Sequence, residues 1–441
     1  MTTPTPAETP PRATDVLVIG GGPAGTTAAT LLARKGWQVT LLEKDHHPRF
    51  HIGESLLPMN MPILERLGVL EQVRRIGVLK LGADFPNGQG HYNVFSFKRA
   101  LNPKSDFAFH VKREEFDQML FEHARDNGVD VREGAKVDQI KFADDGSITV
   151  HAGAQRYQPR YLLDASGRDA FLGSKLGLKR KNAKHASAAV FSHFRGVRRR
   201  EGEDAGNVSI YRHEHGWAWL IPLRDDVMSA GAVCFPDYLK QRKGDTEAFL
   251  MRTLASVPEI ADRMQGAERV APVHVTGNYA YECTRMHGKH WTLLGDAYSF
   301  VDPMFSSGVF LAMHSAELGA EMVDAVLRDP ARESSLQRRL EKHFNRGLDE
   351  FKWFIYRFTS APMKHLFANP KNAFKVEQAV VSMLSGDVFD ARPVLRRLRL
   401  FRVIYAITAL AMAPAAFRGW LRRRRQVGES FAGDTLQAGN P

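Results

Sequence analysis

The pattern of apolar and polar residues predicts the first elements of the fold. The apolar run "DVLVIG" (15–20) ends in glycine, which is typical of a buried parallel strand. Helical spacing follows in "PAGTTAATLLARKG" (23–36) and stops at a glycine, and a second strand follows in "WQVTLLEK" (37–44). Strand, helix and strand in this order predict an α/β fold with a parallel sheet.

Along the rest of the chain, the predicted secondary structure changes twice. An amphipathic helix is predicted over 114–128, and the runs "RYLLDASG" (160–167) and "HWTLLGDA" (290–297) are predicted as strands that end in turns. Short strands predominate between 185 and 285, and after 306 the spacing is mostly helical.

These changes predict how the chain is divided. A Rossmann-like nucleotide-binding domain is expected to be interrupted by a β-rich substrate lobe and followed by a helical region. The predicted parts are a disordered tail (1–13), the first part of the nucleotide-binding domain (14–184, with a substrate-lobe insertion near 81–110), the β-rich lobe (185–285), a return segment of the nucleotide-binding domain (286–330) and a helical C-terminal region (331–441).

Length and composition are compatible with this division. A chain of 441 residues exceeds the size at which one core usually stops growing, so more than one lobe is expected. Cys234 and Cys283 are too few for a disulfide framework and fit a reducing compartment. The first residues lack the apolar core of a signal peptide, and no apolar run is long enough to span a bilayer. A cytoplasmic location is therefore expected.

The net charge of +12 is scattered over several basic runs. No nucleic-acid motif accompanies these runs, so we expect solubility and attraction to acidic partners or lipid headgroups, and no nucleic-acid partner. One run lies in the segment 400–425, where arginines flank an apolar stretch. This segment either packs as a helix over the substrate lobe or lies on the inner face of a membrane, with Trp420 among the headgroups.

The segment "GGGPAG" (20–25) carries the spacing G-x-G-x-x-G between the first strand and the first helix. Gly20 permits the tight turn, Gly22 lets the backbone approach a pyrophosphate, and Gly25 lets the helix pack on the strand. Glu43 ends the next strand, where a carboxylate can bind a ribose hydroxyl. This context predicts a dinucleotide site.

Two more strand-end turns indicate which dinucleotide is bound. They are "DASG", with Asp164 and Gly167, and "GDA", with Asp296. The first turn alone could serve a nicotinamide or a flavin cofactor, whereas three turns far apart in sequence favour the longer FAD. Asp296 is expected to contact the ribityl chain or the pyrophosphate.

Four of these segments together resemble a known superfamily. "DVLVIGGGPAG", "VKREEFDQMLFEHA", "DASG" and "GDA" together are similar to FAD-dependent monooxygenases and geranylgeranyl reductases, over about residues 14–340. The resemblance implies an FAD-binding domain of the glutathione-reductase and p-hydroxybenzoate-hydroxylase type. Arg113 matches an arginine that contacts FAD in that superfamily. The residues expected to bind FAD are Gly20, Gly22, Pro23, Ala24, Gly25, Glu43, Lys44, Arg49, Ser55, Arg113, Asp164, Gly167, Asp296, Gly308 and Val309.

Within that superfamily, four segments resemble flavin-dependent halogenases. "PRFHIGESLLP", with Arg49 and Ser55, is similar to the segment beside the cofactor, although reductases carry a related one. "K-x-G-A-x-F" at Lys80 matches the pattern whose lysine is catalytic, without the Trp-Gly that usually follows. "W-x-W-x-I-P" places Trp217 and Trp219 on one strand face, where their rings can wall off a substrate pocket.

The fourth segment, "DPMFSSGVFLA" (302–312), precedes an apolar helix. A helix start is a ready anion site, and three anions are candidates here: a cofactor phosphate, a flavin ring oxygen and a halide. The resemblance implies that a halide binds to the backbone amides of Ser307 and Gly308. Ser307 is therefore expected to be a catalytic residue, together with Lys80. Phe305 stands where tryptophan halogenases have a glutamate, and it is expected to line the substrate pocket with Trp217 and Trp219. The missing glutamate implies that the substrate is an activated ring and not indole.

The resemblance implies FAD-dependent halogenation of an electron-rich aromatic, a phenol or a pyrrole, free or bound to a carrier protein. A separate flavin reductase is the expected partner, and no metal is expected. The alternative is an FAD-dependent monooxygenase or a reductase of an aromatic or lipid-like substrate.

Overall fold

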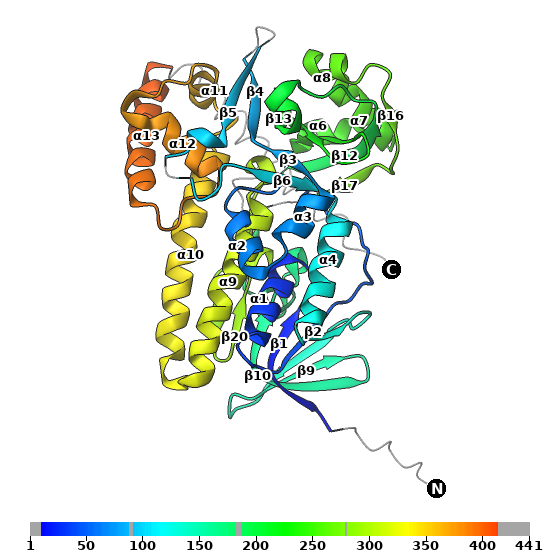
Figure 1. Ribbon diagram of the computed structural model, residues 1–441, viewed down its shortest axis with the longest axis vertical. Helices are drawn as coiled ribbons and strands as arrows, with labels where there is room; N and C mark the ends of the chain where they lie inside the picture. Colours follow the sequence, from blue (N-terminus) through cyan, green and yellow to red (C-terminus); the bar gives the residue numbers. More distant parts are fainter. Residues whose placement is uncertain are drawn as a thin grey trace.

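The computed structural model describes residues 10–87, 91–101, 103–181, 187–242, 244–277 and 280–412. A mixed sheet forms the base of the molecule (Figure 1). Its main path is β19 (His287–Gly288), β20 (Trp291–Leu293), β10 (Gln155–Asp164), β1 (Arg12–Ile19), β2 (Val39–Leu42) and β7 (Asp130–Arg132).

The centre of this sheet is parallel, as the apolar runs predict. β1 pairs in parallel with both β2 and β10, and β20 pairs in parallel with β10. Val16 to Val18 have no exposed surface, which explains the continuous apolar run. The hairpin of β8 (Gln139–Phe142) and β9 (Ile148–Ala152) pairs with β10 at the base.

Helices cover this sheet. α1 (Pro23–Ala33) connects β1 to β2 and packs against α4 (Arg113–Asp126) and α9 (Ser307–Arg328). Three shorter helices also belong to this part of the chain: α2 (Asn60–Leu67), α3 (Leu70–Ile76) and α5 (Phe171–Lys175).

A second sheet lies above the first in Figure 1. Its strands are β16 (Glu268–Arg269), β12 (Ala188–Arg195), β15 (Val227–Cys234), β14 (Gly216–Pro222), β13 (Val208–His213), β4 (Gly82–Pro86) and β5 (Tyr92–Ser96), and β17 (His274–Thr276) also pairs with β12. Most neighbours are antiparallel, but β4 runs parallel to β13. The segment 82–96 therefore joins a sheet whose other strands come from 188–276.

Short strands form two further small sheets. β3 (Gly77–Lys80) pairs with β6 (Ala108–Val111). A separate three-stranded sheet contains β11 (Lys179–Lys181), β18 (Tyr281–Cys283) and β21 (Ser299–Phe300).

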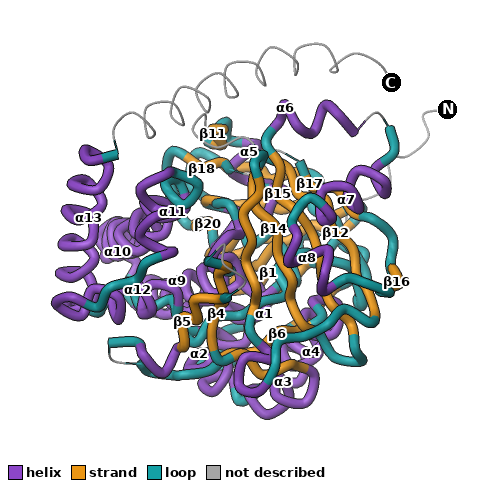
Figure 2. Tube along the Cα trace, turned by 90° about the horizontal axis from the view of Figure 1, so that it is seen from above, coloured by secondary structure: helices purple, strands orange, loops and turns teal. Residues whose placement is uncertain are grey.

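Most of the remaining helices flank the second sheet on two sides, as Figures 1 and 2 both show. On one side are α6 (Pro236–Leu239), α7 (Thr246–Ala255) and α8 (Pro258–Arg263). On the other are α11 (Ala361–Ala368), α12 (Val376–Leu384) and α13 (Arg392–Ala411), whereas α10 (Glu333–Ile355) runs below them beside α9 (Figure 1).

α13 covers the first part of the arginine-rich segment predicted as a packed or membrane-bound helix. It buries Val394, Leu398 and Phe401, and it packs against α11 and α12. Trp420 and the rest of 413–425 lie outside the described residues. Among the residues that the structure describes, no helix combines the length and the apolar character needed to cross a bilayer.

The start of the fold differs slightly from the prediction. β1 begins at Arg12, inside the stretch 1–13 expected to be disordered, because the backbone of Arg12 and Ala13 continues the ladder with β10. Residues 1–9 of that stretch lie outside the described residues.

Candidate functional site

A long cavity runs from the glycine-rich turn to the second sheet. Residues from both sheets, from the segment 49–55 and from the start of α9 line it. Its wall contains most of the residues predicted to bind FAD, namely Gly20, Gly22, Pro23, Ala24, Glu43, Lys44, Arg49, Ser55, Arg113, Gly167, Asp296, Gly308 and Val309.

The glycines of the glycine-rich turn have two different roles, one in packing and one at the ligand site. A Cβ on Gly25 would lie 1.8 Å from the carbonyl oxygen of Gly20, so no side chain fits there. A Cβ on Gly22 would meet only Arg49 Nη2, at 3.6 Å. Gly25 is therefore required for packing and lies outside the cavity wall, whereas Gly22 leaves room for a ligand.

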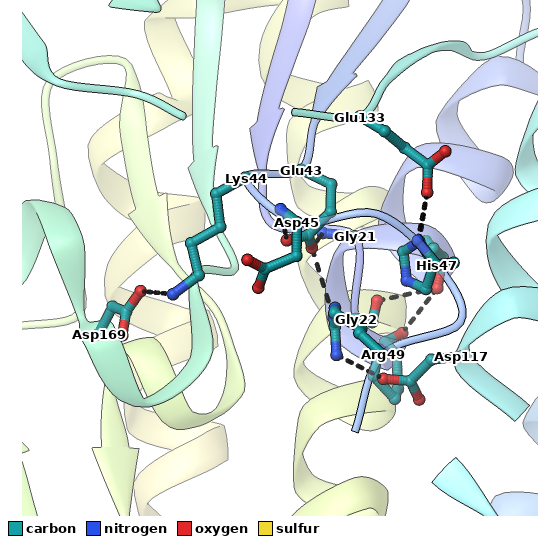
Figure 3. Close-up of polar contacts among 12 residues, drawn as sticks. Gly21, Gly22, Glu43, Lys44, Asp45, His47, Arg49, Asp117, Glu133 and Asp169 are labelled. Carbon is teal, nitrogen blue, oxygen red and sulfur yellow. Dashed lines mark hydrogen bonds and ion pairs between the residues drawn. The ribbon is translucent and has the colours of Figure 1, made fainter. Parts of the chain in front are cut away.

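Glu43 ties this turn to the end of β2. Its Oε2 accepts a hydrogen bond of 2.7 Å from the amide of Gly21, and its Oε1 accepts one of 3.0 Å from the amide of Asp45 (Figure 3). Glu43 thus holds the backbone that faces the cavity, besides lining the cavity where a ribose is expected.

Two arginines on the cavity wall share a carboxylate that sequence analysis missed. Asp117 on α4 accepts hydrogen bonds from Arg113 Nε at 2.8 Å and Nη2 at 2.9 Å, and from Arg49 Nη1 at 3.2 Å. Burial alone would raise the pKa of Asp117, but the two arginines hold it below its ordinary value. The spacing of four residues from Arg113 on a helix was the available signal for this pair.

An ion pair bridges two walls of the cavity. Lys44, just after β2, contacts Asp169 Oδ2 with its Nζ at 2.6 Å (Figure 3). Asp169 follows β10, and both residues line the cavity. Both side chains are half-exposed, so the pair is a weak contact between the two turns.

The two aspartates predicted at strand-end turns have different roles. Asp164 is fully buried and outside the cavity wall, because it accepts hydrogen bonds from the amides of Ser166 at 2.9 Å and Leu172 at 2.7 Å. The prediction of a cofactor contact for Asp164 is corrected here, since the carboxylate holds the turn instead. Asp296 does line the cavity, and burial raises the pKa of its carboxyl to about 6, although Arg168 and Arg113 oppose the shift.

Lys80, at the end of β3, lies behind the cavity wall. Its side chain is 2% exposed, and its Nζ donates hydrogen bonds to Ser55 Oγ and to the carbonyl oxygen of Leu56, each at 3.0 Å. Ser55 itself lines the cavity. Burial without a carboxylate partner lowers the pKa of the Lys80 amine to about 7. A buried amine of this kind is a strong indicator of a functional site.

The segment before α9 forms a tight turn at the cavity. Ser306 adopts the left-handed conformation (φ 57°) and lines the cavity beside Gly308. Ser307 begins α9, and its hydroxyl is buried without a hydrogen-bond partner. A helix start with an unpaired hydroxyl and amides near the cavity suits a small anion.

Phe305 does not lie where the sequence predicted. It was expected to line the substrate pocket, but it is outside the cavity wall. Its buried ring packs edge-on against Phe358, with 5.4 Å between the ring centroids. The left-handed turn at Ser306 separates Phe305 from the start of α9.

One face of the second sheet forms an aromatic wall of the cavity. Trp217 and Trp219 lie on β14, both line the cavity, and their ring centroids are 5.6 Å apart. Glu54 belongs to the segment that the sequence placed beside the cofactor, whereas its partner His193 was missed. Glu54 lines the cavity, and its Oε1 lies 2.7 Å from Nε2 of His193. No local motif marks this pair, because the two residues are 139 positions apart.

This set of residues fits FAD. Gly22 leaves space beside the backbone where a pyrophosphate binds, Glu43 is positioned for a ribose, and the segments 49–55 and 306–309 line the far end of the same cavity. Ser307 lies between the lining residues Ser306 and Gly308, but its buried hydroxyl is itself outside the cavity wall. The cavity therefore continues beyond the nucleotide end toward the aromatic wall.

Comparison with known proteins agrees with this geometry. Residues 13–342 match the family described as the FAD binding domain. The chain is 36% identical over 354 residues to the tryptophan 2-halogenase of Chondromyces crocatus, covering 76% of this chain and 66% of that protein. It is 34% identical over 352 residues to flavin-dependent halogenase armH3 of Armillaria mellea, covering 72% and 68%. The chain thus spans about two thirds of the length of these two relatives.

A third relative is matched over most of its length. It is the 1H-pyrrole-2-carbonyl-[peptidyl-carrier protein] chlorinase of Pseudomonas fluorescens, 28% identical over 410 residues, covering 86% of this chain and 90% of that protein.

Solved structures have the same fold. A flavoprotein/dehydrogenase from Cytophaga hutchinsonii superposes with a TM-score of 0.82 at 28% identity, covering 91% of this chain and 100% of that one. The myxobacterial chondrochloren halogenase CndH superposes with a TM-score of 0.75 at 29% identity, covering 91% and 97%.

Proposed function

This chain belongs to the flavin-dependent halogenases, and we propose that it halogenates a small electron-rich aromatic ring, a phenol or a pyrrole. In this proposal Lys80 is the catalytic amine, and the halide binds at Ser307 and Gly308. FAD is the cofactor, and a separate flavin reductase supplies it in reduced form. The substrate is either free or bound to a carrier protein, as in the pyrrole-carbonyl relative.

Lys80 carries this proposal. Its Nζ is buried, has no carboxylate partner within the described part of the chain, and is oriented by Ser55 Oγ and the Leu56 carbonyl oxygen. Bound reduced FAD supplies the oxygen chemistry that oxidises a halide. The amine then holds the oxidised halogen species by a hydrogen bond beside the ring, in a region from which the aromatic wall excludes water.

The start of α9 is proposed as the halide site. The helix has a partial positive charge at this end, and the Ser307 hydroxyl has no hydrogen-bond partner among the residues that the structure describes. Position 305, where tryptophan halogenases have a glutamate, is a phenylalanine in this chain. Its ring packs against Phe358, so the turn offers no carboxylate at that position. This supports an activated ring as the substrate and disfavours indole.

The test is an assay with purified protein, a flavin reductase, NADH, oxygen, bromide and a panel of phenols and pyrroles. We expect a brominated product with the bromine isotope doublet by mass spectrometry. Lys80→Ala should reduce its formation by at least about 100-fold, while FAD binding stays unchanged. Full bromination by Lys80→Ala would exclude the role assigned to the amine.

The same assay tests the alternative of a monooxygenase or a reductase. The structural similarity to the Cytophaga hutchinsonii flavoprotein/dehydrogenase is the observation that supports this alternative. Hydroxylated product, or NADH consumed without the added reductase, would favour that alternative. Contact of the C-terminal helix with a membrane is a separate proposal. It is supported by the exposed Val403, Ile407 and Leu410 of α13, and co-sedimentation with anionic vesicles would test it.

A further inference from the structure

An arginine on the second sheet has two buried donor atoms and, among the described residues, no counter-charge. Arg212 lies on β13, and its Nε and Nη2 atoms are buried without hydrogen-bond partners. Among the residues that the structure describes, no carboxylate pairs with this guanidinium. Burial lowers the pKa of Arg212 to about 10, and no acidic neighbour offsets that shift. An unpaired buried charge is costly, so its presence requires a reason.

The two unpaired atoms form one edge of the guanidinium. Nε–H and one N–H of Nη2 point in the same direction, which is the fork that binds both oxygens of a carboxylate. The flat face of the group lies over the ring of Phe358, with Cζ 4.1 Å from the ring centroid. Stacking on a ring leaves the edge donors free to bind a ligand in the plane of the guanidinium.

A second unpaired donor lies on the neighbouring strand. Trp217 is directly opposite Arg212 in the register of β13 and β14, so both side chains point to the same face of the sheet. The indole Nε1 of Trp217 is also buried without a partner. By contrast, Nε1 of Trp219 donates to Ser229 Oγ at 3.2 Å.

This face of the sheet lines the cavity. Val208 and Ile210 precede Arg212 on the same face of β13, and both line the cavity together with Trp217. Phe358, under the guanidinium, also packs against Phe305, next to the turn proposed to hold the halide. Trp217 thus lines the cavity itself, and Arg212 lies beside it on the same face of the sheet, just outside the cavity wall.

We propose that Arg212 and Trp217 form a subsite for the carboxylate of a small aromatic acid, which is the substrate to be halogenated. Arg212 binds the two carboxylate oxygens through Nε and Nη2, and Trp217 donates to one of them. The inference rests on the proposed halogenase function and makes it more specific. A free acid, such as a hydroxybenzoate or a pyrrole carboxylate, satisfies these donors, whereas a carrier-bound thioester lacks the charge.

The test compares acids with their methyl esters. Binding of para-hydroxybenzoate, pyrrole-2-carboxylate and the two methyl esters to the FAD-loaded protein is measured by calorimetry. We expect each acid to bind at least about 10-fold more tightly than its ester. Arg212→Gln and Trp217→Phe should weaken binding of the acid about 10- to 100-fold and change binding of the ester by less than about 2-fold.

A thermal control separates a binding role from a structural one. Arg212→Met should leave the Tm of the ligand-free protein unchanged or raise it by a few degrees, because a buried unpaired charge is removed. Arg263 is the matched control, since it donates to Ser209 Oγ and Tyr211 Oη, each at 2.8 Å, on the same strand. Arg263→Met should lower the Tm by about 5 °C or more.

Several results would overturn the proposal. They are equal binding of acid and ester by the wild type, no binding of either acid at millimolar concentration, equal losses for acid and ester in the variants, and a large fall in Tm for Arg212→Met. Failure of the halogenase function would be distinguishable. Binding of the acid that depends on Arg212 without any halogenated product would sustain the subsite, whereas equal halogenation of acid and ester would sustain the function alone.

Discussion

At the scale of single residues, the buried amine of Lys80 has consequences for both chemistry and stability. Its hydrogen bonds to Ser55 Oγ and to the Leu56 carbonyl oxygen orient it, and its burial lowers its pKa to about 7 from the ordinary 10.5. A group whose pKa is lower in the folded state destabilises the fold wherever it is charged. That destabilisation is complete below about pH 7 and fades as the pH rises from 7 toward 10.5.

Lys80→Met should therefore be more stable than the wild type, and more so in acid. We expect a gain of roughly 2–4 kcal/mol in the free energy of unfolding at pH 6, falling to almost nothing near pH 10. Urea unfolding at pH 6, 8 and 10 measures this. Lys240, whose side chain is 62% exposed, provides the control, and Lys240→Met should show no such pH dependence. A gain that is constant with pH would contradict the lowered pKa.

The hydroxyl of Ser307 has a different signature, because it is buried but unpaired. Ser307→Ala should change the free energy of unfolding by less than about 1 kcal/mol and raise the KM for bromide about 10-fold. Ser315 on the same helix is the contrast, since its Oγ accepts from the amide of Gly295 at 2.8 Å. Ser315→Ala should cost about 1–2 kcal/mol of stability and leave the bromide KM unchanged. Bromide-dependent rates and urea unfolding of both variants decide the matter.

At the scale of elements, the strand–turn–helix unit of β1 and α1 contains one glycine that folding requires and another that ligand binding requires. Gly25 is packed against the carbonyl oxygen of Gly20, whereas Gly22 faces the cavity. The same sequence motif therefore contains two kinds of glycine, and the consequences of replacing them differ.

Gly25→Ala should prevent correct folding, because its Cβ would lie 1.8 Å from a backbone oxygen. Gly22→Ala should fold with a Tm close to that of the wild type and bind FAD at least about 10-fold more weakly, since the methyl group occupies the approach to the pyrophosphate. Circular dichroism and the visible absorbance of retained flavin report the two effects. Normal FAD retention by Gly22→Ala would contradict the placement of the pyrophosphate.

At the scale of the whole molecule, the cavity spans two sheets that are built from interleaved parts of the chain. The segment 82–96 joins the second sheet, and β20 returns to the first. The cofactor end of the cavity is formed mainly by the first sheet, and the aromatic end by the second. The sequence contains one G-x-G-x-x-G segment and no second nucleotide unit of that kind.

The protein should therefore need reduced FAD and not a reductase as such. Free FAD reduced chemically with dithionite, in the presence of oxygen and bromide, should support bromination of an active phenol or pyrrole without any reductase. Product analysis by mass spectrometry measures this, and Lys80→Ala serves as the inactive control. Product formed only with the reductase present would show that the partner does more than supply reduced flavin.

Sequence alone was enough for features set by local backbone geometry. The order of strand, glycine turn and helix predicted the first sheet, because the hydrophobic period and the glycine spacing act over a few residues. Alternation along β14 placed Trp217 and Trp219 on one face, as the structure has them. The family, the FAD cofactor and the halogenase activity also followed from motifs in the sequence, as the matches to known halogenases agree.

Other features depend on which distant segments pack together. Asp164 was predicted at the cofactor but holds its own turn, and Phe305 turns away to Phe358. The unpaired fork of Arg212 beside Trp217 has no local signature either. Burial and hydrogen-bond partners are properties of packed neighbours, often more than a hundred positions away, so only the tertiary structure decided which polar groups are satisfied and which remain available to a ligand.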